Sequence, residues 1–326
     1  MTPASMPVRP VSAAADPPTA TSATFANAAV VSRSWYPVLR SRQVPPGRVR
    51  SASLGSRRLA VYRDRAGTAH VLDARCPHLG ADLCQGRVVD GGLRCAFHGW
   101  SFGPDGRCRE APGHAAVPDR RARAYPVVER WGFIWLFNGH EPLFPLPDGP
   151  PDPSSWIIRL PPQRIRCHPH LVLANGLDVA HYEGLHGLRL SEPPRLAVKA
   201  WRVSVSLQGR PLSRRWQWAS GSTAREIVAD FTTVGGSLAW TTVSSPIRFE
   251  VLFTGRPHGR GECLTQTVFF FPQRPGAAWL RALGVMITLL HDDRRVLEGL
   301  EFRPAFTGAD EPIREYARVV NALGAW

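Results

Sequence analysis

The sequence lacks the features that would place it among membrane, secreted or dinucleotide-binding proteins. No apolar run approaches the ~20 residues that cross a bilayer, because the nearest candidate, residues 283–290, is far too short. Residues 1–30 hold no compact apolar segment of the kind that a secretory signal needs. A Gly-x-Gly-x-x-Gly fingerprint is also missing. We therefore expect a cytoplasmic protein without a membrane span.

Acidic residues are scarce relative to basic ones. The 40 Lys and Arg residues outnumber the 26 Asp and Glu residues, which gives a net charge of +14. The basic residues are scattered without a run of five or more, so a nucleic-acid-binding tract is not predicted. The excess charge would suit an acidic protein partner instead. Cysteine is sparse as well, and four of the six cysteines fall between residues 76 and 108, which favours metal ligation over a disulfide framework.

The pattern along the chain predicts a tail and two domains. Residues 1–30 are poor in charge and rich in small residues, so we expect a disordered tail there. Residues 31–145 alternate short apolar runs with turns, which indicates a small all-β domain. Six prolines between residues 142 and 153 mark a linker.

The remainder, residues 146–326, is expected to contain a sheet and helices, so the fold class is α+β. The patterns favour a helical segment near 171–186, strands between 201 and 271, and helices near 279–302 and 311–323.

Four side chains of the first domain have the spacing of a metal site. They are Cys76, His78, Cys95 and His98, so each half supplies one thiolate and one imidazole. Structural zinc sites more often pair Cys with Cys and His with His, although a zinc site remains the alternative. Mixed halves suit a [2Fe–2S] cluster in which one iron takes both sulfurs and the other takes both nitrogens.

The stretch from Cys76 to Trp100 resembles the cluster-binding loops of Rieske non-heme iron oxygenases. Rieske proteins of cytochrome complexes carry an additional cysteine in each loop, joined as a disulfide, where this sequence has Ala81 and Phe97. The resemblance implies a Rieske domain, with a lower-potential cluster on the four side chains above. It also implies a larger catalytic domain with an antiparallel sheet flanked by helices, of the helix-grip type.

A second motif follows about 80 residues later. Asn175, Asp178 and His181 are three residues apart, a spacing that predicts one face of a helix. His186 overshoots that face unless the helix loosens at the glycines around it. Two histidines and a carboxylate form the facial triad of oxygen-activating ferrous iron. Taken alone, a histidine on an amphipathic helix is more often an ordinary core or surface residue.

The resemblance extends to this motif and implies a role for each of its residues. In the family, the two histidines bind a mononuclear Fe(II), which assigns that role to His181 and His186. An Asp on a late helix is the third ligand, and Asp293 fits best, with Asp292 as the alternative. Asp178 would hydrogen-bond an iron-binding histidine and a cluster histidine of a neighbouring subunit. The expected pair is His181 and the neighbouring subunit's His98, and Asn175 would line the site beneath the iron.

The resemblance also implies an activity and partners. The protein would be the terminal oxygenase of a homotrimer, supplied with electrons from NAD(P)H by a separate ferredoxin or flavin reductase. It would use O₂ for mono- or dioxygenation, desaturation or ring closure of a hydrophobic aromatic, steroid-like or secondary-metabolite substrate. The alternatives are a Rieske electron-transfer protein without oxygenase activity and a scaffold with an inactive iron site.

Overall fold

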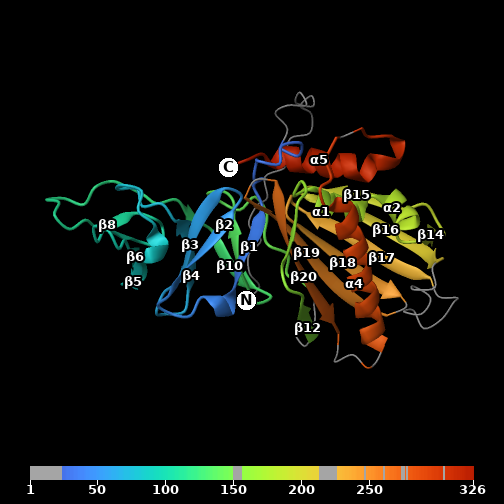
Figure 1. Ribbon diagram of the computed structural model, residues 1–326, viewed down its shortest axis with the longest axis horizontal. Helices are drawn as coiled ribbons and strands as arrows, with labels where there is room; N and C mark the ends of the chain where they lie inside the picture. The colour runs from blue at the N-terminus through green and yellow to red at the C-terminus, as the bar shows by residue number, and fades with distance from the viewer. Residues whose placement is uncertain are drawn as a thin grey trace, which may run out of the picture.

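The computed structural model describes residues 24–149, 156–212, 226–245, 247–259, 261–272, 276, 278–303 and 305–326. They form an elongated molecule with a small all-β part at one end and a larger part, built on one antiparallel sheet with helices, at the other (Figure 1). The α+β class expected from the sequence is confirmed. Among the described helices, none combines the length and hydrophobicity that a membrane span requires.

The first part consists of three small antiparallel sheets. They are β1-β11-β10, β2-β3-β4-β9 and β5-β6-β7-β8, with η1 (Ser41–Gln43) and η2 (Leu83–Gln85) in the connections. The strands are β1 (Trp35–Arg40), β2 (Val49–Leu54), β3 (Arg57–Arg63), β4 (Ala69–Asp73), β5 (Arg87–Val89), β6 (Gly92–Arg94), β7 (Ser101–Phe102), β8 (Cys108–Glu110), β9 (Ala124–Tyr125), β10 (Val127–Arg130) and β11 (Phe133–Phe137).

The second part is a nine-stranded antiparallel sheet with the order β12-β20-β19-β18-β17-β16-β14, while β13 pairs with β20 and β15 with β16. The strands are β12 (Trp156–Arg159), β13 (Gln163–Ile165), β14 (Leu188–Leu190), β15 (Arg195–Lys199), β16 (Arg202–Pro211), β17 (Ile227–Val234), β18 (Leu238–Ser245), β19 (Phe249–His258) and β20 (Glu262–Phe271). The helical elements are α1 (Leu171–Ala174), η3 (Asn175–Leu177), α2 (Val179–Gly184), α4 (Ala278–Leu297), η4 (Gly308–Asp310) and α5 (Glu311–Leu323).

The large sheet is buried on both faces. On one face, Trp240 and Phe270 contact Trp131 of the first part, with ring centroids 5.5 and 6.1 Å away. Their strand neighbours point to the opposite face because side chains alternate along a strand. On that face, α4 crosses the sheet (Figure 1) and encloses a cavity together with α2 and η3.

Two of the helices expected from the sequence differ from the structure. The helix expected at 171–186 is broken into α1, η3 and α2. The helix expected at 279–302 ends at Leu297, because the Gly299 amide turns away to donate to the Arg166 carbonyl oxygen at 2.7 Å. The last helix, α5, has the predicted bounds.

The expected disordered tail through residue 30 is wrong for residues 24–30, whereas residues 1–23 lie outside the described residues. Phe25 is only 3% exposed. Its ring stacks on His170 and meets Phe302 and Tyr316 edge-on, with centroids 5.3 to 5.8 Å apart. Its amide donates to Asn321 Oδ1 at 2.8 Å. An aromatic side chain buried in this way fixes the segment against the second part.

Replacing Phe25 with Ala should lower the free energy of unfolding by about 3 kcal/mol, because the ring leaves a cavity among other aromatic rings. Urea unfolding measures this loss. Leu280→Ala is the control, since Leu280 is 58% exposed and its truncation should change stability by less than ~0.5 kcal/mol. Equal stabilities of the two variants would contradict the packing of Phe25.

Candidate metal centres

The loops that carry the first four candidate ligands have matching backbone geometry. In each loop, the backbone amide of the cysteine donates a hydrogen bond to the carbonyl oxygen of the residue five positions later. Cys76 donates to Ala81 and Cys95 donates to Trp100, both at 2.8 Å. The glycine four residues after each cysteine donates back to that cysteine. Both glycines, Gly80 and Gly99, have left-handed φ angles of 81° and 71°, a conformation that favours glycine.

These two loops bring the four expected ligands together at the outer end of the first part. Cys76 and Cys95 are 2% and 4% exposed and are close enough for their thiols to hydrogen-bond. The imidazoles of His78 and His98 lie nearer the surface, with ring centroids 4.7 Å apart. The thiols therefore face the core while the imidazoles face outward.

The electrostatics of this group fit a metal cluster. Burial, together with the neighbouring Cys95, raises the pKa of the Cys76 thiol to about 11, so a bound metal must displace its proton. Burial, with smaller contributions from His98 and His114, lowers the pKa of His78 and favours the neutral imidazole that a metal needs. The His78 Nδ1 atom is buried and has no hydrogen-bond partner in the described part of the chain, which leaves it available as a ligand.

One residue beside the cluster loops has a role that the sequence alone did not indicate. The Trp100 indole lies parallel to the His78 imidazole, with ring centroids 4.3 Å apart and planes inclined by 3°. This stacking fixes the orientation of His78. Trp100 ends the second loop motif, but motif spacing carries no information about stacking.

A second group of possible ligands forms between α2 and α4. His181, His186 and Asp293 each offer one atom, and these atoms lie within 4.8 Å of one another. Asp293 Oδ1 is 2.9 Å from His186 Nε2 and 3.8 Å from His181 Nε2. Asp292, the alternative expected from the sequence, instead has its carboxylate 3.7 Å from His291 Nδ1. The geometry therefore favours Asp293 in a group that has the composition of a ferrous facial triad.

The backbone of Asp178 orients His181. A carbonyl oxygen can only accept, so His181 Nδ1 donates to the Asp178 carbonyl, and its Nε2 keeps a lone pair directed at Asp293 and His186. Burial lowers the pKa of His181, which again favours the neutral ring.

The expectation that Asn175, Asp178 and His181 share one face of a continuous helix is wrong. Asp178 has an extended conformation (φ −74°, ψ 98°) and is the N-cap of α2. Its Oδ1 accepts hydrogen bonds from the amides of Ala180 at 3.1 Å and His181 at 3.3 Å. Within this chain, the carboxylate thus binds the helix N-terminus, and it is the Asp178 carbonyl that contacts the His181 ring.

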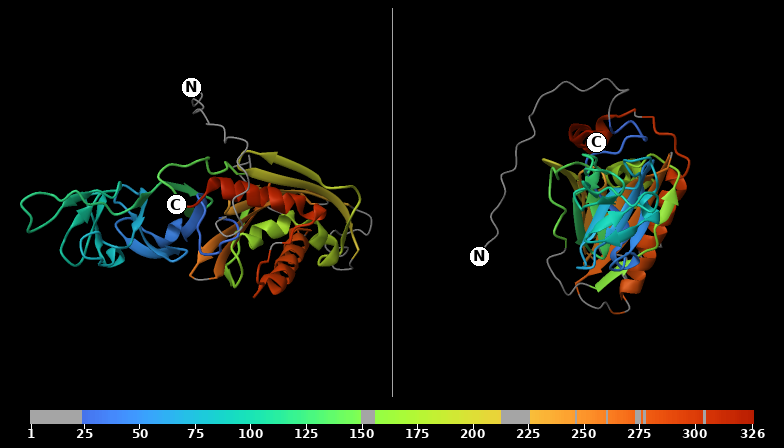
Figure 2. Two further views of the ribbon diagram at one scale, coloured as in Figure 1. Left: turned by 90° about the horizontal axis from the view of Figure 1, so that it is seen from above. Right: turned by 90° about the vertical axis from the view of Figure 1, so that its left-hand side faces the viewer.

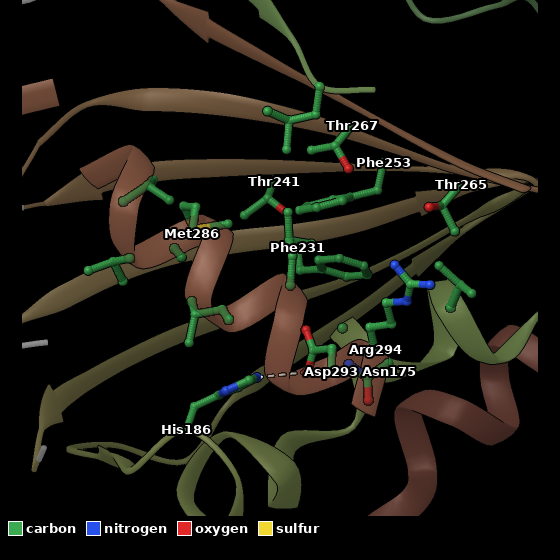
Figure 3. Close-up of a pocket in the computed structure, with 18 of the residues that line it drawn as sticks. Asn175, His186, Phe231, Thr241, Phe253, Thr265, Thr267, Met286, Asp293 and Arg294 are labelled. Atoms are coloured by element: carbon green, nitrogen blue, oxygen red, sulfur yellow. Dashed lines mark hydrogen bonds and ion pairs between the residues drawn. The ribbon is translucent and has the colours of Figure 1, made fainter. Parts of the chain in front are cut away.

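A cavity of about 190 Å³ adjoins this group and opens toward the large sheet (Figure 3). Asn175 lines it from η3, and Asp293 lines it from α4. Gly176 allows η3 to lie close to the sheet, because a Cβ at this position would lie 2.2 Å from the Phe231 ring of β17. The other walls are mainly apolar side chains of the sheet and of α4, including Phe231, Phe249, Phe253, Met286 and Leu290. The sequence predicted the three phenylalanines in strands and Met286 and Leu290 in a late helix, but an apolar composition alone could not separate cavity lining from core.

Comparisons with known proteins agree with this arrangement. Residues 34–125 match the Rieske [2Fe-2S] domain. A cholesterol 7-desaturase of Xenopus laevis is 37% identical over 160 residues, which are 47% of this chain and 35% of the relative. A 4beta-methylsterol monooxygenase of Methylococcus capsulatus is 35% identical over 165 residues, 47% of this chain and 44% of the relative. A crystal structure of dicamba monooxygenase bound to 3,6-dichlorosalicylic acid superposes with a TM-score of 0.72 at 21% identity and covers 90% of this chain and 98% of that one.

Residues 34–125 belong to the Rieske [2Fe-2S] domain family, and relatives of the chain are named as desaturases, monooxygenases and oxygenase subunits. The structural likeness, at 21% identity, bears on the fold alone. The chain aligns with less than half of the length of both the desaturase and the methylsterol monooxygenase, so the similarity does not carry their activities to this protein.

The N-cap of α2 can be tested by two substitutions of Asp178. Asp178→Ala should lower the free energy of unfolding by about 1 kcal/mol, because the first amides of α2 lose their acceptor. Asp178→Asn keeps an acceptor oxygen and should stay close to the wild type in urea unfolding. Equal losses in the two variants would contradict the capping role.

Proposed function

We propose that this protein is the terminal component of an oxygenase system that oxidises an apolar small molecule. The observation that supports this most is the position of His181, His186 and Asp293 beside an apolar cavity. A structural metal site would be closed by a fourth protein ligand, whereas this group faces open space on the cavity side. Open positions beside a substrate pocket are what oxygen activation requires.

The proposed sites hold two different metal groups. Cys76, His78, Cys95 and His98 would bind a [2Fe–2S] cluster, and His181, His186 and Asp293 would bind a mononuclear Fe(II). When bound, these groups supply one-electron transfer and oxygen activation. Electrons would come from NAD(P)H through a separate ferredoxin or flavin reductase, for which the net charge of +14 favours an acidic donor.

The surrounding residues prepare the reaction by position and polarity. The Asp178 carbonyl keeps the His181 ring in the tautomer whose Nε2 is free to bind a metal. Apolar walls formed by Phe231, Phe249 and Phe253 favour a hydrophobic substrate and limit water at the reacting centre. Asn175 supplies an amide at the edge of the cavity near Asp293.

The arrangement of the chain favours electron transfer between subunits. The cluster loops lie at one end of the molecule and α2 with α4 at the other (Figure 1). A head-to-tail homotrimer would bring His98 of one chain close to Asp178 of the next and would close the contact into a ring. Asp178 Oδ2 has no hydrogen-bond partner among the described residues, so it is the atom we assign to that bridge.

The oxygenase activity itself can be tested with a surrogate reductase. The purified protein, supplied with NAD(P)H and O₂, should add oxygen atoms to, or remove hydrogens from, one or more members of a panel of sterols and aromatic metabolites. Mass spectrometry detects either change. Reduction of the cluster with no product from any member would favour a simple electron carrier.

Iron analysis tests the ligand assignment. The wild type should hold about three irons per chain, two in the cluster and one in the mononuclear site. His181→Ala and Asp293→Ala should each lose about one iron while the visible spectrum of the cluster persists. Asp292→Ala is the matched control and should retain all the iron. Loss of iron from Asp292→Ala, with retention in Asp293→Ala, would reverse the choice of carboxylate.

Asp178→Asn tests the proposed bridge between subunits. The variant keeps the N-cap and the backbone carbonyl, so both metal groups should remain bound. Re-oxidation of the reduced cluster by O₂ in the presence of substrate should slow by about 10- to 100-fold in stopped-flow measurements. Glu183→Gln, an exposed acid in the same helix, serves as the control. An unchanged rate in Asp178→Asn would remove the bridging role.

A further inference from the structure

The sheet wall of the cavity contains a polar atom for which the chain provides no partner. Thr241 on β18 lines this wall beside Phe231 and Phe253, across the cavity from His186 and Asp293 (Figure 3). Its Oγ1 is buried and has no hydrogen-bond partner among the residues that the structure describes. The residue as a whole is partly exposed and lines the cavity, so a change of χ1 rotamer would be needed to turn the hydroxyl toward a bound ligand.

Three other hydroxyl groups around the cavity, those of Thr265, Tyr182 and Thr254, are satisfied within the protein. Thr265 donates to the Gln163 carbonyl at 3.3 Å, and Tyr182 donates to the Gly176 carbonyl at 2.8 Å. Thr254 donates to the Gln266 carbonyl at 3.5 Å. Thr241 therefore differs from Thr265 and Thr254 in hydrogen bonding and not in residue type.

A buried hydroxyl without a partner destabilises the folded protein, and a ligand that hydrogen-bonds to it removes this cost. Valine has nearly the same shape as threonine and would occupy the same position without that cost. The Thr241 hydroxyl is thus useful only when a group from outside the chain lies in the cavity.

The charges around the cavity restrict what that group can be. Arg294 is the single Lys or Arg among the described lining residues, and it is exposed, with its guanidinium 3.4 Å from the Gln163 side-chain oxygen. Asp293 is the carboxylate of the proposed metal group. The neighbours of Thr241 on the sheet wall are apolar, and they provide no charge that would stabilise an ionised group.

We propose that Thr241 is a specificity-determining residue that binds a neutral oxygen group, a hydroxyl or a carbonyl, on an otherwise apolar ring substrate. This inference rests on the proposed function, because it places the substrate in the cavity beside the metal group. The threonine hydroxyl donates to a carbonyl and accepts from a hydroxyl, so both groups fit the same position. Phe231 and Phe253 then contact the ring of the substrate on either side of Thr241.

Equilibrium binding of four bicyclic probes to the metal-loaded protein tests this, by calorimetry under argon. The probes are naphthalene, 2-naphthol, 2-acetylnaphthalene and 2-naphthoate. The wild type should bind 2-naphthol and 2-acetylnaphthalene about tenfold more tightly than naphthalene, which corresponds to one hydrogen bond to a buried group. Thr241→Val should reduce this preference to about one, and Thr241→Ser, which retains a hydroxyl, should keep it.

Thr265→Val is the matched control, because Thr265 lines the same cavity but already donates to Gln163. It should leave the probe preference unchanged. Thermal unfolding of the ligand-free protein distinguishes a ligand-binding role of the Thr241 hydroxyl from a structural role, because the two roles predict opposite changes in stability. Thr241→Val should be at least as stable as the wild type, whereas loss of a structural hydrogen bond would lower its stability.

Three results would overturn the proposal. One is a wild type that does not distinguish 2-naphthol from naphthalene or binds neither at millimolar concentration. Another is a Thr241→Val variant that keeps the preference. The third is a wild type that binds 2-naphthoate most tightly of the four probes, together with an Arg294→Gln variant that loses this binding. That result would show that the cavity binds carboxylates. The assay needs no oxygen activation, so failure of turnover with intact Thr241-dependent binding would reject only the proposed function.

Discussion

The break in the helix at Asp178 is the local feature on which the second metal group depends. At this residue the backbone leaves the helical conformation, so its carbonyl is free to accept from His181 Nδ1 and its carboxylate caps α2. In a continuous helix, that carbonyl would be bonded to the amide four residues later and could not orient an imidazole. α2 ends at Gly184, so His186 lies beyond the helix, and both His181 and His186 reach the same carboxylate of α4 although their spacing of five residues does not suit one helical face.

The same principle operates at the other end of the molecule. Each cluster loop is closed by backbone hydrogen bonds between a cysteine and residues four and five positions later. A left-handed glycine makes this closure possible, and it turns the buried thiol inward while the histidine remains near the surface. In both sites, the ligand side chains are positioned by irregular segments of backbone that are fixed by local hydrogen bonds. The strands and helices around these segments hold them in place.

The sequence predicted those features of the structure that depend on residues close together along the chain. The cluster loops, the class of the fold, the main strands of the second part and the bounds of α5 could all be derived from local patterns. The helix break was missed because a three-residue spacing was taken as evidence for continuity. A signal was available, since Gly176 disfavours a helix interior by about 1 kcal/mol and Asp is a preferred N-cap. The burial of Phe25 carried no local signal, because its partner Asn321 is 296 residues away.

The two ends of the described chain pack against different parts of the molecule. This packing bears on electron transfer between the two proposed metal sites. Phe25 packs on the second part, whereas Trp326 packs on the first, 4.3 Å from the Arg123 guanidinium and 5.3 Å from the Tyr125 ring. The contact of Trp131 with Trp240 adds a third connection. Figure 1 and Figure 2 place the C-terminus at the junction of the two parts. A chain held at three points keeps its cluster end directed away from its own cavity. Under the proposed function, each cavity would then receive electrons from the cluster of another copy, so the contacts at the termini would determine which faces of neighbouring subunits can meet.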